Sequence, residues 1–560
     1  MAKYLLIITS FLFLQDLFAQ GEAYYTAPMD IPLYLSGNFG EMRKNHFHTG
    51  IDIKTQGRQK IPVKAIADGY ISRIKVSPYG YGNALYIDHL DGTTSVYAHL
   101  REFNDSIADY MRTKQYEAKN WALDYYLEAF EFEVFQGEII GLSGNTGSSS
   151  GPHLHFEIRD TRSEHPLNPL RYGFKVKDDR RPEIKGVRVY PLSANSHVEM
   201  EREAKSYVAL EDGSGKHILK QKISAYGEVG LAIHTFDRMT GTNNKYGIYS
   251  LSMKVDGLEH YSHVMDELDF DNFRQVNCHK DYDLFHLNRW RYHKCFPSEN
   301  NTLEIYDLLV DGGKIHLRPG DSFDVEFIVK DIDGNESQIA FELNCGEPLK
   351  TSAPIRDGVL MDASTDNIFT VDGLAVRIPH GRIYDDFYLR PSRKARPNGP
   401  SDLFYLNDRD IPLDDEIVIS LQSRMPRSEW KYSILEHTDY RGRVNYIKGT
   451  MRDGWYEVRS KYLGAYRLVE DRVSPQISIE YSSKSRKLNL HLSDDISGVD
   501  TMSVEVNGNW LRMAHNASMS RAWGDMNEIE LPSGRTDIRV YARDLAGNEV
   551  IEMRKVHLLK

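Results

Sequence analysis

Three short segments in the first third of the chain combine imidazole and carboxylate groups at strand-like spacing. HFHTGID places His48 and Asp52 four residues apart, and an extended chain brings both to one face. GPHLHFEI carries His153 and His155, which a strand turns to the same side, and VYAHL adds His99. Nitrogen and oxygen donors without thiolate suit Zn²⁺, and a catalytic zinc site needs only three protein ligands. These five residues therefore form a candidate zinc centre.

The same alternation predicts how the neighbouring side chains point. In GPHLHFEI the intervening apolar residues should pack inward, so that Glu157 shares the side of His153 and His155. We expect Glu157 to orient a ligand or to form a structural ion pair rather than to bind the metal. In VYAHL, Tyr97 and His99 should share one face, with Tyr97 either lining the groove or packing.

Other sequence features invite a chemical interpretation that we weigh against a simpler one. His46 is expected at the groove rim, and the glycine-rich segment 144–151 is expected to flank the substrate. DIDGNESQIAFE at 331–342 resembles part of a calcium loop, but Glu336 stands where that loop requires Gly, so a hairpin turn is predicted. DGSGK at 212–216 lacks the upstream Gly and the following Ser or Thr of a phosphate-binding loop, so we reject that interpretation.

Histidines and cysteines further along the chain give no catalytic pattern. His279, His286 and His293 are seven residues apart, and we interpret them as polar surface residues. The three cysteines are too few for a disulfide framework or a thiolate metal cage. One Cys278–Cys295 bridge is compatible with the sequence, which would leave Cys345 unpaired or buried.

Short strands must position the candidate metal ligands. After residue 27, β-branched or alternating runs are separated by turns rich in Gly and Asp, which predicts an all-β domain over residues 28–176. Residues 104–135 differ, because they are rich in helix formers and contain neither Gly nor Pro. We expect a helical insertion there, acting as a lid or specificity wall because it directly follows the strand of His99.

Three more β domains are predicted, at residues 180–346, 350–470 and 474–560. The first and last share a repeat with Asp-Gly or Asn-Gly hairpin signals, which favours Ig-like β-sandwiches, the first with an insertion near 258–312. The repeat pairs SLSMKVDG (250–257) and FIVKDIDGNE (327–336) with TMSVEVNG (501–508) and RVYARDLAGNE (539–549).

The N-terminal residues have the pattern of an export signal. Lys3 precedes an apolar run from Tyr4 to Leu14, and Ala19 offers a cleavage point, so residues 1–19 are predicted to be a signal peptide. No later segment approaches 18 consecutive apolar residues, so no membrane span is expected in the mature protein. The protein is thus expected in the periplasm, in the cell envelope or outside the cell.

The charge balance excludes one class of partner. Lys and Arg number 69 against 81 Asp and Glu, which gives a net charge of −12 without a polybasic block. Nucleic acid is therefore not expected as a partner.

The motifs together closely resemble one enzyme family. The order Phe39-Gly40, His48-x-x-x-Asp52, Tyr97-Ala98-His99 and GNTGSSSGPHLHFEIRD (144–160) is similar to that of lysostaphin/LytM-type zinc metallopeptidases, which cut peptide bonds in peptidoglycan. The resemblance covers residues 36–160. It implies a mainly β protein whose N-terminal LytM-type domain is an antiparallel β domain of the duplicated hybrid motif.

The resemblance also implies roles for the five residues. His48, Asp52 and His155 match the family's ligands for one Zn²⁺, and His99 and His153 match its catalytic pair. The expected function is an exported zinc endopeptidase acting on peptidoglycan cross-links or stem peptides. The alternative is a non-hydrolytic cell-wall-binding scaffold or amidase activator whose groove is occluded by the insertion. An envelope protein that docks on the C-terminal β domains is a further expected partner.

Overall fold

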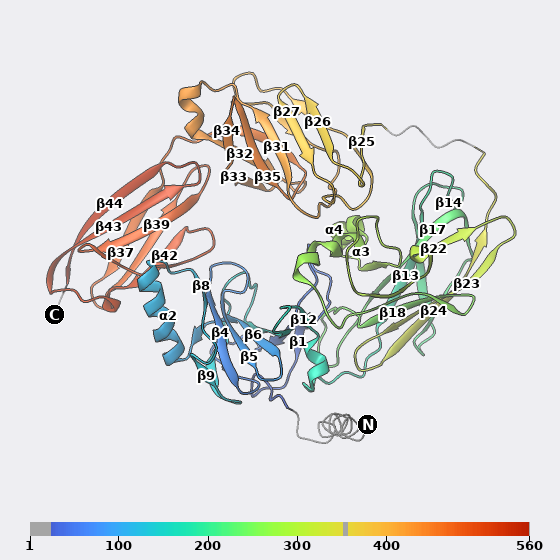
Figure 1. The fold of residues 1–560 in the computed structure, drawn as a ribbon, viewed down its shortest axis with the longest axis horizontal. Helices are drawn as coiled ribbons and strands as arrows, with labels where there is room; N and C mark the ends of the chain where they lie inside the picture. Colours follow the sequence, from blue (N-terminus) through green and yellow to red (C-terminus); the bar gives the residue numbers. More distant parts are fainter. Residues whose placement is uncertain (1–23, 351–356, 559–560) are drawn as a thin grey trace, which may run out of the picture.

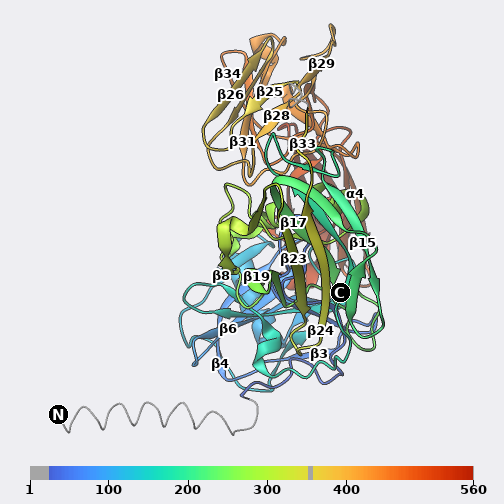
Figure 2. The ribbon, with the colours of Figure 1, turned by 90° about the vertical axis from the view of Figure 1, so that its right-hand side faces the viewer.

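The computed structural model describes residues 24–350 and 357–558, so the predicted signal peptide lies outside the described residues. The fold is mainly β, as the sequence predicts, and four β-rich units follow one another around a ring (Figure 1). In the side view, residues 357–471 lie at the opposite end of the molecule from the first unit (Figure 2). None of the helices in the described ranges combines the length and apolar character needed to cross a bilayer.

The first unit is built on one large antiparallel sheet. Buried apolar side chains such as Ile53, Tyr97 and Phe156 pack on one of its faces to form the core. The strands that carry the candidate metal ligands are adjacent in its centre. In spatial order the sheet contains β1 (Leu35–Gly37), β2 (Ile51–Lys54), β11 (His153–Asp160), β6 (Thr93–Leu100), β5 (Asn83–His89), β4 (Gly69–Val76) and β8 (Leu123–Tyr126).

The insertion at 104–135 is only partly helical, which corrects the prediction. Helix α2 (Asp105–Ala118) begins where the Asn104 side chain accepts a hydrogen bond from the Ile107 amide. The chain then forms β8 and β9 (Glu133–Val134), which both pair with β4. Because β4 lies toward the sheet edge opposite β2, the insertion extends the sheet away from the candidate metal ligands.

The second unit and the last unit use their repeated segments in the same way. β18 (Ser250–Val255) pairs antiparallel with β23 (Ser322–Lys330), and β39 (Val499–Val506) pairs antiparallel with β43 (Gly534–Asp544). Each first strand ends in a tight turn in which both residues have positive φ, at Asp256-Gly257 and at Asn507-Gly508. The repeat in the sequence therefore corresponds to a repeat in strand pairing.

The remaining strands of the second unit enclose its own core. Between β18 and β23 the chain forms most of the predicted insertion, including β19, α3 and β20. The elements of this unit that matter below are β17 (Ile223–Phe236), β19 (Leu258–Val264), α3 (Val276–His279), α4 (Tyr282–Asn288), β20 (Tyr292–Lys294), β21 (Tyr306–Leu309) and β24 (Glu336–Cys345).

The third unit contains two five-stranded sheets and one two-stranded sheet, the fourth contains two four-stranded sheets, and each unit has its own apolar core. In the third, the two five-stranded sheets are centred on β31 (Ile417–Gln422) and β36 (Ala465–Glu470). In the fourth, two four-stranded sheets include β38 (Lys487–Ser493), β42 (Arg521–Asp525) and β44 (Glu549–Leu558) beside β39 and β43.

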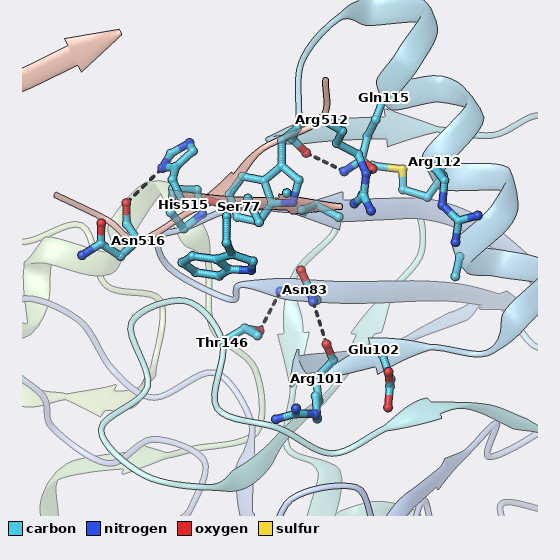
Figure 3. Close-up of a pocket in the computed structure, with 18 of the residues that line it drawn as sticks. Ser77, Asn83, Arg101, Glu102, Arg112, Gln115, Thr146, Arg512, His515 and Asn516 are labelled. Carbon is cyan, nitrogen blue, oxygen red and sulfur yellow. Dashed lines mark hydrogen bonds between the residues drawn. The ribbon is translucent and has the colours of Figure 1, made fainter. Parts of the chain in front are cut away.

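Contacts between the first and last units close the ring. Tyr116 and Gln115 of α2 bond to Glu528 and Arg512 at 3.1 and 3.3 Å, and the ring of Trp121 packs edge-on against His515. A cavity of about 850 Å³ lies at this junction, with α2 on one side and the last unit on the other (Figure 3). None of the candidate metal ligands lines this cavity.

The cysteines do not form the bridge that the sequence left open. All three lie in described ranges and are free, with Cys278 and Cys295 buried. Cys278 donates instead to the Gln275 carbonyl.

Candidate metal centre

Strand register brings two of the predicted ligands into one row of the sheet. His155 on β11 lies opposite Asp52 on β2 and opposite Ala98 on β6. His48 lies just before β2, where its backbone bonds in both directions to the turn at Gly40 and Glu41. The candidate centre is therefore held by the middle of the sheet and one hydrogen-bonded loop.

Three donor atoms converge at this point. Asp52 Oδ1 lies 3.1 Å from His48 Nε2 and 2.9 Å from His155 Nδ1. The two imidazole nitrogens are 3.0 Å apart. All three side chains are buried and their donor atoms form a group that could hold one metal ion. Two imidazoles and one carboxylate match the donor set that suits zinc.

Hydrogen bonds on the far side of each ligand fix which atom faces the centre. His48 Nδ1 lies 2.8 Å from the Asn38 carbonyl, and His155 Nε2 lies 2.7 Å from Glu157 Oε1. An N–H that donates to these acceptors leaves His48 Nε2 and His155 Nδ1 with bare lone pairs. Asp52 presents Oδ1 to the histidines and Oδ2 to Arg43.

Glu157 contacts a ligand and is not part of the ligand group. Its carboxylate accepts hydrogen bonds from Arg159 Nε at 2.7 Å, from Tyr81 at 2.6 Å and from Thr49. Sequence reasoning did not single out Arg159, Tyr81 or Thr49. Alternation alone could have indicated Arg159, which follows Glu157 on the same strand face.

His99 and His153 lie beside the ligand group with their rings 4.8 Å apart. His99 Nδ1 is 2.9 Å from the Thr146 carbonyl, and His153 Nδ1 is 2.8 Å from the Gly151 carbonyl. In both rings the other nitrogen, Nε2, is left to exchange a proton. His153 Nε2 is 3.4 Å from Asp52 Oδ1, so it directly adjoins the centre.

The prediction that Tyr97 and His99 share a face is wrong. Tyr97 is fully buried in the core, where its hydroxyl accepts from the Ile66 amide. His99 has a φ of +59°, and this left-handed residue breaks the alternation of β6 and turns the imidazole to the side of His155. The other alternation holds, since Leu154 and Phe156 pack in the core.

Burial and neighbouring charges shift the pKa values of the histidines in opposite directions. Burial lowers the pKa of His48 to about 4. Burial and the nearby His155 and His153 lower the pKa of His99 to about 3. Burial also acts on His155, but hydrogen bonds to Asp52 and Glu157 outweigh it and raise the pKa to about 9. His155 is therefore the imidazole at which protons compete most strongly with a metal ion.

A cavity of about 500 Å³ opens at the centre, and the glycine-rich loop lines it from Ser148 to Gly151. None of residues 104–135, all of which the structure describes, lines this cavity. At Gly147, with a φ of +69°, a Cβ would lie 2.3 Å from the Gly82 amide nitrogen, so the loop crosses another backbone there. Asp52, His99 and His153 also line the cavity.

The other histidines that the sequence motifs drew attention to lie in two different places. His46 lies outside the ligand group, with its ring beside Phe273 of the second unit. His279 and His293 are 1% and 2% exposed, so the prediction that they are surface residues is wrong. They form a second group with His263, which the sequence analysis did not consider.

Comparisons with known proteins agree with the motif order. Residues 46–118 and 128–169 match Peptidase family M23, and residues 358–471 match the Zu5-like domain. A DD-carboxypeptidase/endopeptidase, Mpg, from Neisseria meningitidis is 38% identical over 123 residues, which are 22% of each chain. Lysostaphin from Staphylococcus simulans is 35% identical over 97 residues, 17% of this chain and 15% of that one. The chain thus spans about a fifth of the length of these relatives.

Among solved structures, a zinc-containing peptidase from Vibrio cholerae is 25% identical with a TM-score of 0.20 and covers 27% of this chain and 40% of that one. The ranges that match the family model contain all five predicted residues. The segment from residue 46 to residue 169 is a peptidase family M23 domain.

Proposed function

We propose that this protein is an exported zinc-dependent endopeptidase that hydrolyses peptide bonds in peptidoglycan. His48, Asp52 and His155 would hold the zinc ion. The observation that carries the proposal is the convergence of these three donors beside a cavity that Asp52, His99 and His153 line. A metal site for structure alone has no need of proton-handling groups beside an open cavity.

When bound, zinc supplies Lewis acidity and lowers the pKa of a bound water to about 7. His99 and His153 supply the proton transfers that hydrolysis needs. With Nδ1 anchored on a carbonyl, one Nε2 accepts a proton from the attacking water and delivers it to the leaving amine. The other histidine, when protonated at both ring nitrogens, donates its Nε2–H to the carbonyl oxygen as negative charge develops there.

The second-layer contacts support this chemistry. Glu157 holds His155 in the tautomer that presents Nδ1, and Asn38 does the same for His48 Nε2. Arg43 bonds Asp52 Oδ2 and thereby keeps Oδ1 directed at the two histidines. Such partners orient ligands and raise metal affinity.

The occluded-scaffold alternative has little support. It requires the insertion to fill the groove, whereas the described insertion joins the sheet at β4 and lines no part of the cavity at the centre. The names of the relatives, among them a DD-carboxypeptidase/endopeptidase, favour a peptide substrate. The predicted signal peptide and the peptide substrate together support action on the cell wall.

The proposal is tested by incubating the purified chain with peptidoglycan and identifying the released fragments by mass spectrometry. We expect new peptide termini with the native chain and none with His155→Ala. His46→Ala is the matched control, because His46 lies close in sequence but outside the ligand group. Binding without release by the zinc-loaded native chain would contradict the proposal and favour the scaffold.

A further inference from the structure

Three histidines from separate elements meet in the interior of the second unit. His263 lies on β19, His279 ends α3 and His293 lies on β20. Their exposed fractions are 0%, 1% and 2%. We propose that His263, His279 and His293 hold a second zinc ion, with a structural role.

The geometry of the three rings is that of a ligand group. Each offers one nitrogen, and these atoms all lie within 4.8 Å of one another. His279 Nε2 and His293 Nδ1 are 3.2 Å apart, and the centroid of the His263 ring is 5.2 and 5.7 Å from those of His279 and His293. Three imidazole nitrogens this close can coordinate one ion with little rearrangement of the chain.

One nitrogen in the group is buried without a hydrogen-bond partner in the described part of the chain. His263 Nε2 is buried and has no hydrogen-bond partner among the described residues. A buried imidazole nitrogen without a partner costs about 1–3 kcal/mol, so such groups are rare unless something fills the position. A metal ion between the three rings would satisfy His263 Nε2.

Two tyrosines complete the arrangement behind the rings. The Tyr261 hydroxyl is 2.8 Å from His263 Nδ1, and the Tyr306 hydroxyl is 3.3 Å from His279 Nδ1. If each Nδ1–H donates to its tyrosine, Nε2 of both rings carries a free lone pair. At His48 and His155, too, a hydrogen bond holds the ring nitrogen that faces away from the ligand group. Here the hydrogen-bond partners are neutral hydroxyls.

The chemistry of the group selects the ligand. A neutral imidazole nitrogen is the commonest protein ligand for a transition-metal ion. Among the described residues the group contains three imidazoles and no carboxylate, which suits zinc rather than calcium or magnesium. A water molecule or hydroxide would take the fourth position.

The location of the group gives the ion a mechanical role. The Phe47 ring packs edge-on against the His279 ring at 5.7 Å. Lys280, the next residue, donates to the carbonyls of Arg43 and Lys44 at 2.8 Å each. An ion that fixes α3 would therefore also fix the loop that leads into His48.

Metal analysis of a chain without the first site tests the inference. Plasma mass spectrometry of native protein should give two zinc ions per chain, and His155→Ala should retain one. X-ray absorption of His155→Ala should then show nitrogen ligands at about 2.0–2.1 Å. A folded His155→Ala chain that holds no zinc and binds none on reloading would overturn the inference. The same result leaves the first site standing if the native chain holds one ion, so the two proposals can fail separately.

Variants of the second group provide the matched control. In the His155→Ala background, His263→Gln should lose the remaining zinc, and His286→Gln should keep it, because His286 lies in the same insertion but outside the group. Circular dichroism checks that both chains fold. If His263→Gln misfolds, the thermal midpoint of His155→Ala with and without a chelator decides. A drop on chelation that zinc reverses supports a structural ion, and no change contradicts it.

Discussion

The first and second units each bring a buried histidine group together, but they surround it differently. The first group contains a carboxylate, adjoins a cavity of about 500 Å³ and has two more imidazoles within ring contact. The second has only imidazoles, backed by tyrosines in a closed interior. In the proposed roles, similar ligand types serve reactivity where a substrate has access and stability where none does.

The largest expected effect comes from replacing His153, which should change the behaviour of the first group and leave the second group unaltered. We expect His153→Ala to lower the hydrolysis rate by about 10²–10⁴-fold, because it removes a proton-transfer group beside the centre. The zinc content should stay as in the native chain, since His153 is not in the ligand group. Rate and metal content are measured on the same preparation, and loss of zinc in this variant would place His153 among the ligands.

In chelated protein, acid should lower the free energy of unfolding of the second unit around His263, His279 and His293. The pKa of His263 is lowered by burial to about 3, and those of His279 and His293 are lowered well below 6.5. Below pH 6.5 the unfolded chain takes up protons that the folded unit refuses, so the free energy of unfolding falls by about 1.4 kcal/mol per histidine for each pH unit. The stability is fully retained above pH 6.5. Hydrogen exchange of the backbone amides in β19 and β20 measures this free energy of unfolding at each pH.

The control for this pH dependence is His263→Gln, which removes one of the three buried titrating groups. Its pH slope should be smaller than that of the native chain by the contribution of one histidine, about 1.4 kcal/mol per pH unit. An unchanged slope would show that His263 does not contribute to the acid sensitivity of the second unit.

Removing the charge behind a ligand should affect only the first group. We expect Glu157→Gln to weaken zinc binding there by about 10–100-fold, because Glu157 orients His155 and stabilises its bound form. Competition with a chromophoric chelator measures the affinity. Glu267→Gln, which alters the partner of the partly exposed His165, serves as the control. Unaltered affinity in Glu157→Gln would mean that the carboxylate serves only its other partners, Arg159, Tyr81 and Thr49.

The smallest expected effect concerns the tyrosine hydroxyls that contact the histidines of the second group. Tyr261→Phe removes the hydroxyl beside His263 Nδ1, a hydrogen bond worth about 1 kcal/mol. Zinc affinity in the His155→Ala background should fall by less than about tenfold. A larger loss would show that tyrosine backing matters as much as the carboxylate of the first group.

Much of the first site could be predicted because strand alternation is a local property. His153, His155 and Glu157 lie on one face of β11 as their spacing requires. His99 could not be placed in this way, because its left-handed backbone is set by the loop that it contacts at Thr146. The five predicted residues lie together as their motifs predict.

The second group gave no local signal. Its members lie on a strand, a single helical turn and another strand, and only the packing of the insertion brings them together. The spacing of His279 and His293 could not reveal their burial, because histidine is intermediate between buried and exposed residue types. The edge strands of the 104–135 insertion were missed for a similar reason, since their pairing with β4 depends on tertiary structure.

The backbone crossing at Gly147 has a consequence for redesign. The carbonyl that holds His99 belongs to Thr146, one residue before the crossing, and the Gly80 carbonyl accepts from the Ser148 amide just after it. The crossing therefore clamps the imidazole independently of the loop tip. Ser150 can therefore be exchanged without disturbing the crossing, whereas a side chain at Gly147 would collide with the Gly82 backbone and displace the Thr146 carbonyl that holds His99.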